Sequence, residues 1–208
     1  LFIIDVKNSG LISFDALPLF FKYSNKRGNA VGNLPIPLNG SGVIPEQAFE
    51  VANNVIKNMN IVLEQLIPNL TIGIKVIGTQ TMKNGETGYI IELISKKNKK
   101  EIALRYESEG IKKIVSILQL LIVVYNNDSI TVAIDELDSG IFEYLLGEIL
   151  RIISEKGNGQ LIFTSHNLRP LETIDKGFIA FTTTNVNNRY IRFSNVKNNN
   201  NLRDFYYR

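Results

Sequence analysis

The chain has 208 residues, of which 44% are hydrophobic and 21% charged, and its formal net charge is +3 at pH 7. These values are typical of a globular protein of one domain, or of one large domain with a small insert, and the mild charge permits a nucleic-acid partner without requiring one. The sequence has no cysteine and one histidine, which excludes disulfides and argues against a histidine-rich metal site. The most apolar run, residues 114–125, is too short to span a bilayer, and we see no signal peptide. We therefore expect a cytoplasmic protein with no membrane partner.

The N-terminal portion predicts a strand, a long loop and a helix. Residues 1–6 have the apolar run of a strand, whereas the Gly-, Asn- and Pro-rich residues 24–45 predict an exposed loop. Residues 45–67 predict a helix, because Pro45 suits the first helical position and Pro68 ends the segment. Its apolar face has spacings of three or four. That face consists of Ala48, Val51, Val55, Met59, Val62 and Leu66.

The remainder predicts an antiparallel meander, followed by alternating strands and helices. Polar turns separate three strand-like runs, residues 71–77, 88–95 and 100–106. A helix over residues 109–125 is apolar nearly all round, so we expect it to be buried. The segments that follow are strand 130–135, helix 141–155, strand 160–165, a short helix near 168–174 and strand 178–183. This alternation predicts βαβ units in a parallel sheet with helices on both faces.

The stretch SITVAIDELDSG, residues 129–140, contains the first candidate site. A continuous apolar run is typical of a buried parallel strand, and ligands of open α/β sheets bind beyond the carboxyl ends of such strands. Asp135 and Glu136 stand at that end. One carboxylate can hold Mg²⁺ while its neighbour orients or deprotonates a water, as nucleotide hydrolysis requires. The alternative is that both are solvated residues that open a loop.

Two further stretches stand at comparable places. Ser108 precedes the long helix as a candidate N-cap, and Gly110 would let a ligand approach the backbone, so free N–H groups there predict an anion site. The alternative is an ordinary N-cap followed by a tolerated glycine. Strand 160–165 runs into His166, which a parallel sheet would bring beside the two carboxylates, in reach of a phosphate or the attacking water. A lone histidine is more often structural.

The order of these stretches resembles the C-terminal half of an ABC-type ATPase head, of the kind shared by SMC, RecF and OLD-like proteins. ESEG (107–110) is similar to the signature motif, TVAIDE (131–136) to Walker B, LDSG (137–140) to the D-loop, and TSH (164–166) to the switch histidine. The wording IDELDSGIFEYLL is similar to a bacterial subgroup that includes many phage-defence proteins, although that subgroup often has His where this chain has Phe142. The signature also lacks the second Gly and the Gln of transporter heads.

The resemblance implies an α/β fold, similar to a P-loop NTPase, with helices flanking a parallel sheet and an antiparallel and helical portion before it. It covers residues 88–208, which would form the C-terminal half of the ATPase domain. Agreement is weaker over residues 1–87, which would form an insert or lid. The implied cofactors are ATP and Mg²⁺.

The same resemblance implies roles for individual residues. Asp135 would hold Mg²⁺, Glu136 would be the general base, and His166 would contact the γ-phosphate. Ser108 and Gly110 would close over the ATP of a partner head. ATP would thus drive formation of a homodimer, and hydrolysis would release it, controlling an effector protein or a nucleic-acid clamp.

One part of the family pattern is missing from the sequence. A P-loop needs G-x-x-x-x-G-K-[ST], and neither Gly-Lys-Ser nor Gly-Lys-Thr occurs in the 208 residues. We expect this Walker A segment to lie upstream of Leu1 or on another chain, so that the chain alone binds nucleotide poorly. In the dimer, Asp138 of the D-loop would couple the two sites.

Two other functions stay open. The first is a degenerate head that binds a protein or DNA without turnover, and the second is an Mg²⁺-dependent nuclease with Asp135, Glu136 and Asp138 as ligands. A basic turn and the C-terminal tail could contact nucleic acid. More commonly such a turn is only solvated, and such a tail packs on its own domain or on a partner. The turn contains Lys96, Lys97, Lys99 and Lys100. The tail contains Arg203, Tyr206, Tyr207 and Arg208.

Overall fold

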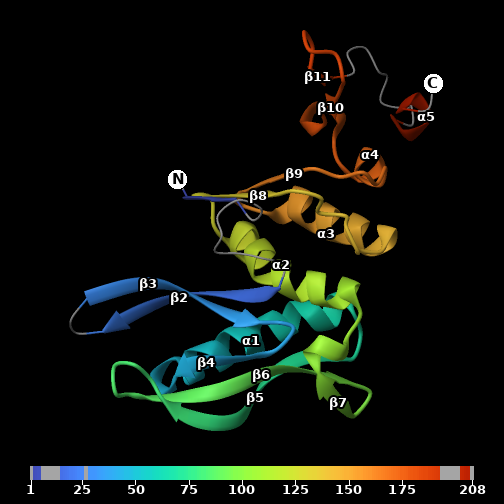
Figure 1. Ribbon diagram of the computed structural model, residues 1–208. Coiled ribbons are helices and arrows are strands. Elements are labelled where there is room, and N and C mark those ends of the chain that lie inside the picture. The colour runs from blue at the N-terminus through green and yellow to red at the C-terminus, as the bar shows by residue number, and fades with distance from the viewer. Residues whose placement is uncertain (1, 6–14, 26–27, 193–201, 207–208) are drawn as a thin grey trace.

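Figure 1 shows the computed structural model, which describes residues 2–5, 15–25, 28–192 and 202–206. The first part contains β1 (Phe2–Asp5), β2 (Ala16–Asn25), β3 (Gly28–Pro37), β4 (Ser41–Pro45), α1 (Glu46–Leu66), β5 (Leu70–Thr81), β6 (Thr87–Lys97) and β7 (Lys100–Ala103). The second part contains the 3₁₀ turn η1 (Leu104–Tyr106), α2 (Glu109–Asn126), β8 (Ile130–Ile134), α3 (Glu143–Lys156), β9 (Gln160–Phe163), α4 (Pro170–Thr173), η2 (Lys176–Phe178), β10 (Phe181–Thr182), β11 (Tyr190–Ile191) and α5 (Leu202–Tyr206).

An antiparallel sheet carries helix α1 on one face (Figure 1). β6 pairs with β4, β5 and β7, so the predicted meander is confirmed. β6 therefore pairs with strands on both sides of the boundary predicted at residues 87 and 88. The predicted helix 45–67 is also confirmed, although Pro45 ends β4 and caps α1 instead of beginning it.

The apolar face predicted for α1 is displaced by one residue. The structure buries Ala52, Ile56, Met59 and Leu63, of which only Met59 was predicted. Val55, Val62 and Leu66 are partly buried. Two adjacent stripes of this helix share the spacing of three and four, so periodicity identifies the helix but not which stripe meets the sheet.

The predicted exposed loop over residues 24–45 is wrong over most of its length. β2 and β3 form an antiparallel hairpin in which Leu17 lies opposite Ile36, and both side chains are fully buried. Glycine, asparagine and proline are typical of loops, but alternate apolar residues here turn to the core. Proline is tolerated in a strand whose missing N–H would face outward at an edge, which explains how Pro35 and Pro37 fit.

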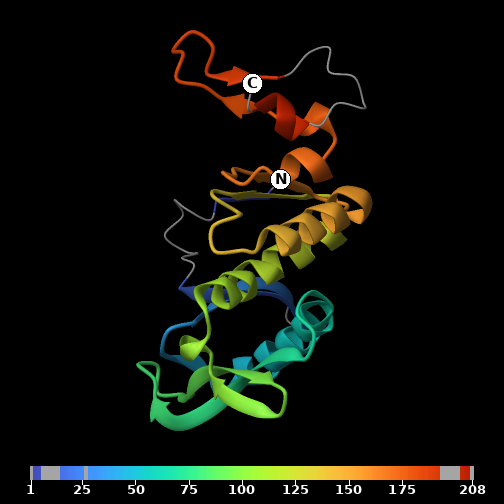
Figure 2. The same ribbon diagram turned by 90° about the vertical axis from the view of Figure 1, so that its right-hand side faces the viewer.

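The second sheet is parallel and contains β1, β8 and β9 in that order. Val132 and Ile134 of β8 are buried, and α2 packs against this strand. Both views place α2 and α3 on the same side of the sheet (Figure 2). On β9, Ile162 is paired with Ala133 and its side chain is 53% exposed, so the described residues leave part of the sheet uncovered.

Helix α2 lies between the N-terminal elements and the parallel sheet. It contacts β2 and α1 on one side and β8 and α3 on the other. The ten residues from Lys112 to Leu121 are therefore all buried, which confirms the prediction of a helix buried all round. Two lysines, Lys112 and Lys113, lie in this buried run.

The C-terminal segment departs from the predicted parallel sheet. The strand predicted over residues 178–183 is reduced to β10, which pairs antiparallel with β11. In α5, Arg203 pairs with Glu143 and Glu172, and the ring of Tyr206 stacks on Phe181. This part of the tail packs on its own chain, whereas residues 193–201 and 207–208 lie outside the described residues. In the part of the chain that the structure describes, no helix is long and apolar enough to cross a membrane.

Candidate functional site

The carboxyl ends of β8 and β9 are tied together by backbone hydrogen bonds. The N–H of Thr164 donates to the carbonyl of Ile134 at 3.1 Å, and the N–H of Leu137 donates to the carbonyl of Thr164 at 3.0 Å. The turn after β8 and the segment after β9 thus meet at one edge of the parallel sheet, as the βαβ pattern predicts.

A single threonine fixes both members of the Asp-Glu pair. The hydroxyl of Thr164 donates to Oδ1 of Asp135 and accepts from the N–H of Glu136 at 2.8 Å. Asp135 is partly buried at the end of β8. Thr164 directly follows β9, so the end of this strand orients the carboxylates that follow β8.

Glu136 has an unusual backbone. Its φ is 51°, in the left-handed region, which costs a non-glycine residue about 1–3 kcal/mol. Its carbonyl accepts hydrogen bonds from the N–H of Ser139 at 3.0 Å and from Nζ of Lys113 at 3.3 Å. The Glu136 side chain is 49% exposed, and its Oε1 lies 3.9 Å from Nε2 of His166, which is 85% exposed. The two groups are therefore neighbours that are open to solvent, and they attract one another when the imidazole is protonated.

Asp138 holds the histidine segment in its own chain. Its carboxylate accepts from the N–H of His166 at 3.2 Å and from the N–H of Asn167 at 3.0 Å. A carboxylate with two backbone donors is a charge-assisted anchor. The position of His166 thus depends on Asp138, whereas the predicted coupling across a dimer stays a prediction.

Ser108 caps α2, as predicted. Its Oγ accepts from the N–H of Ile111 at 3.3 Å, and the serine itself is exposed. Gly110 is approached closely by this chain's own backbone, since a Cβ at Gly110 would lie 2.4 Å from the carbonyl oxygen of Gly140. Gly140 in turn has a φ of 74°. The two glycines therefore bring the start of α2 against the end of the Asp-Glu turn.

Replacing Gly110 by alanine is expected to destabilise the fold. The added methyl group would meet backbone, which cannot rotate away, so we expect a loss of about 1–3 kcal/mol in the free energy of unfolding. Urea denaturation measures it. The matched control is Gly40→Ala, because a Cβ at Gly40 meets nothing within 4 Å. Equal stabilities of the two variants would contradict this packing.

Lys113 brings a buried positive charge to the site. The residue is 7% exposed, and its ammonium donates to the Glu136 carbonyl. Burial lowers the pKa of Lys113, while the carboxylates of Glu136, Asp138 and Asp135 oppose this shift. Sequence reasoning missed both Lys113 and Thr164. The available signal for Lys113 was a lysine pair in a helix that is otherwise apolar nearly all round.

The acidic residues at this edge do not form a three-ligand metal cluster. No group of three His, Cys, Asp or Glu side chains within the described ranges is arranged to hold a metal ion. The Asp138 carboxylate is directed at backbone N–H groups instead. Asp135 fits a different kind of site, in which Mg²⁺ has one or two protein carboxylates and is completed by phosphates and water.

Comparison with known proteins identifies the fold. Neither a protein-family model nor a curated protein sequence matches the chain. The structure is similar to a chain from a study of ATP-driven dimerization and DNA-stimulated activation of SMC ATPases, with a TM-score of 0.51 and 15% identity over 71% of this chain and 86% of that one. It is also similar to the Smc head domain with a coiled coil and joint from Pyrococcus yayanosii, with a TM-score of 0.50 and 16% identity over 70% of this chain and 29% of that one. The fold resembles that of an SMC ATPase head.

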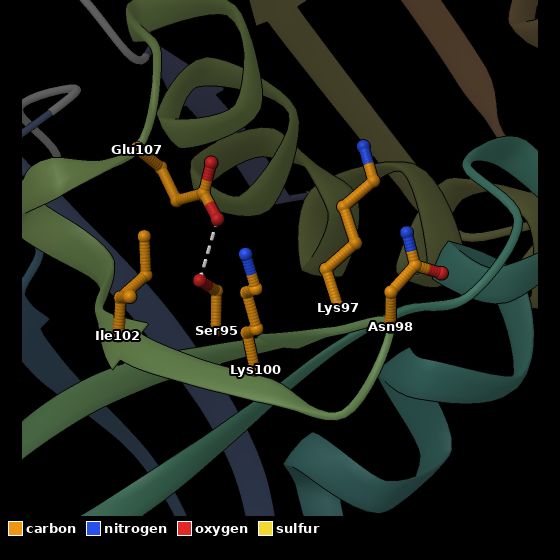
Figure 3. A pocket seen from close by; sticks show the side chains of 6 residues that line it. All are labelled: Ser95, Lys97, Asn98, Lys100, Ile102 and Glu107. Carbon is orange, nitrogen blue, oxygen red and sulfur yellow. Dashed lines mark hydrogen bonds between the residues drawn. The ribbon is translucent and has the colours of Figure 1, made fainter.

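A second feature of this head-like fold is a basic cavity of about 300 Å³ between the β6–β7 hairpin and the start of α2 (Figure 3). Its lining residues are Ser95, Lys97, Asn98, Lys100, Ile102 and Glu107. The hydroxyl of Ser95 donates to Glu107 inside the cavity at 2.5 Å. Lys75 on β5 and Lys96 on β6 both pair with Glu101 on β7. Lys97, Lys99 and Lys100, by contrast, have no acidic partner among the residues that the structure describes.

Proposed function

We propose that this chain is the part of an ABC- or SMC-like ATPase head that carries the catalytic carboxylate and the signature serine. The observation that carries the proposal is the meeting of Asp135, Glu136 and His166 at the carboxyl edge of parallel strands β8 and β9. This is where α/β proteins bind their ligands. The similarity of the fold to SMC ATPase heads supports the same conclusion.

Each residue at the edge has a chemical role in this proposal. Asp135 would hold Mg²⁺, and the ion, when bound, neutralises charge that develops on the phosphates. Glu136, half exposed and fixed through its backbone, would orient the attacking water and accept its proton. His166 would donate a hydrogen bond to the γ-phosphate, from a segment that Asp138 holds in place.

Ser108 and Gly110 suit a role toward a second head. Ser108 is exposed at the N-terminus of an 18-residue helix, where backbone N–H groups and the helix dipole favour an anion. We propose that they close over the γ-phosphate of ATP bound to a partner copy. ATP would then assemble a homodimer that controls an effector protein or a nucleic-acid clamp, and hydrolysis would release it.

The proposal requires a phosphate-binding loop from outside these 208 residues, because the sequence has no Gly-Lys-Ser or Gly-Lys-Thr. In the described residues β9 pairs with β8 alone, and Ile162 on β9 is half exposed. The sheet can therefore extend beyond β9. The test is ATP turnover by the full-length protein, beside its Glu136→Gln variant and the 208-residue chain alone, which we expect to be inactive.

The basic hairpin supports a second candidate function, binding of a nucleic-acid backbone. Three neighbouring lysines without acidic partners can each release a counterion when they meet a phosphate. We expect the triple variant Lys97→Gln, Lys99→Gln, Lys100→Gln to bind DNA more weakly. The slope of log K against log salt should fall by about one per lysine lost.

The matched control for this hairpin is the double variant Lys75→Gln, Lys96→Gln, because both lysines already pair with Glu101. It should change the salt slope less per charge removed. Fluorescence anisotropy with a labelled duplex at several salt concentrations measures both slopes. Equal changes per lysine would point to a general charge effect rather than to a contact at the hairpin tip.

A further inference from the structure

Glu136 is held in its left-handed conformation by contacts to its backbone rather than to its carboxylate. Its N–H donates to Thr164, and its carbonyl accepts from Ser139 and Lys113. Ser139 belongs to the same turn, and Thr164 directly follows β9. Lys113 is the member of this set that comes from α2. The backbone conformation sets the direction in which the Glu136 carboxylate leaves the turn.

The choice of lysine at position 113 needs a reason beyond packing. Residues 114–118 and 120–121 of the same buried run are mostly apolar, and a buried ammonium is costly unless it is paired and hydrogen-bonded. Three carboxylates, Asp135, Glu136 and Asp138, favour its charge, and the Glu136 carbonyl accepts a hydrogen bond from its ammonium. The side chain is therefore matched to the Asp-Glu turn rather than to the core around it.

Lys112 provides an internal comparison. It is equally buried, at 7% exposure, but its ammonium donates to Asn39 at 3.0 Å and pairs with Glu109 at 2.5 Å. Within the described residues its contacts go to the β3–β4 turn and the first turn of α2, and none goes to residues 135–140. The two lysines are adjacent in α2 and equally buried, but Lys113 contacts Glu136 and Lys112 does not.

We propose that Lys113 is a positioning residue for Glu136: by binding the Glu136 carbonyl from α2, it keeps the left-handed turn that directs the carboxylate toward His166. Lys113 would act through the backbone of Glu136. The catalytic consequence rests on the proposed function, in which Glu136 activates water. The structural consequence does not rest on the proposed function: the conformation of the turn at Glu136 would depend on Lys113 in either case.

The experiment compares Lys113→Met with Lys112→Met in the full-length protein. Both variants replace a buried ammonium by an apolar chain of similar length. We expect Lys113→Met to lower kcat for ATP about 10- to 100-fold, because a small misplacement of a catalytic group has such an effect, while KM changes little. Lys112→Met should keep kcat within about twofold. Lys113→Arg, which retains a charged donor, should recover part of the lost kcat. Equal kcat in Lys113→Met and Lys112→Met would overturn the proposal.

Hydrogen exchange of the same variants, without nucleotide, separates this proposal from the proposed function. The Ser139 amide donates to the Glu136 carbonyl, so its exchange should be at least about tenfold faster in Lys113→Met than in Lys112→Met. If the wild-type protein hydrolyses no ATP, the ATPase proposal fails and this exchange rate alone decides on Lys113. Faster exchange confined to Lys113→Met would support the positioning role, and equal exchange in both variants would overturn it.

Discussion

Replacement of Glu136 by glutamine is expected to abolish ATP turnover by the full-length protein while ATP still binds. Glutamine keeps the size of the side chain but cannot accept a proton, and loss of a general base lowers rates by about 10²- to 10⁴-fold. The turn should survive, because Thr164 and Lys113 hold the backbone of residue 136 and not its side chain. Phosphate release measures kcat, and titration with ATP and Mg²⁺ measures Kd.

The same variant should accumulate as an ATP-bound dimer, since hydrolysis is the step that would release the two heads. Light scattering after size exclusion, with and without ATP, detects this change in mass. Glu143→Gln is a suitable control, because Glu143 is an exposed carboxylate that pairs with Arg203 and should leave kcat within about twofold.

Three outcomes would reject this assignment. Normal turnover by Glu136→Gln would mean that another group activates the water. A wild-type protein that neither binds nor hydrolyses ATP would favour an interaction module without turnover. Mg²⁺-dependent cleavage of DNA in the absence of ATP would favour the nuclease, although the described acidic residues form no three-ligand metal cluster.

Local sequence patterns predicted the β5–β6–β7 meander and helix α2, but not the β2–β3 hairpin. The meander of β5, β6 and β7 followed from short apolar runs between polar turns, and buried helix α2 followed from an apolar surface with few gaps. Hairpin β2–β3 was missed because its glycines and prolines are typical of loops, and the burial of Ile36 depends on Leu17, a distant partner. Strand pairing is set by tertiary packing, which overrides local preference.

The candidate site, too, was predictable only in part. The proximity of Glu136 and His166 was predictable, because parallel strands bring their carboxyl ends to one edge. The left-handed turn at Glu136 was not, since a glutamate carries no signal for a positive φ. That turn is what brings the backbone carbonyl to Lys113. The contributions of Thr164 and Lys113 therefore depend on the left-handed backbone of Glu136, which local sequence patterns do not predict.

Replacement of Asp138 by alanine is expected to lower both activity and stability, because the carboxylate anchors the His166 segment within one chain. The N–H groups of His166 and Asn167 would lose their acceptor, at a cost of about 1–3 kcal/mol in the free energy of unfolding, and kcat should fall about 10- to 100-fold as His166 loses its position. Asp138→Asn keeps one acceptor oxygen and should be intermediate in both respects. Asp128→Ala, at the opposite end of β8, is the control and should change kcat little.

Urea unfolding without nucleotide discriminates between two roles of Asp138, an anchor within the chain and a coupling residue across the dimer. A residue that acted only across an ATP-bound dimer would leave the unfolding of the nucleotide-free protein unchanged, whereas an anchor within the chain must weaken it.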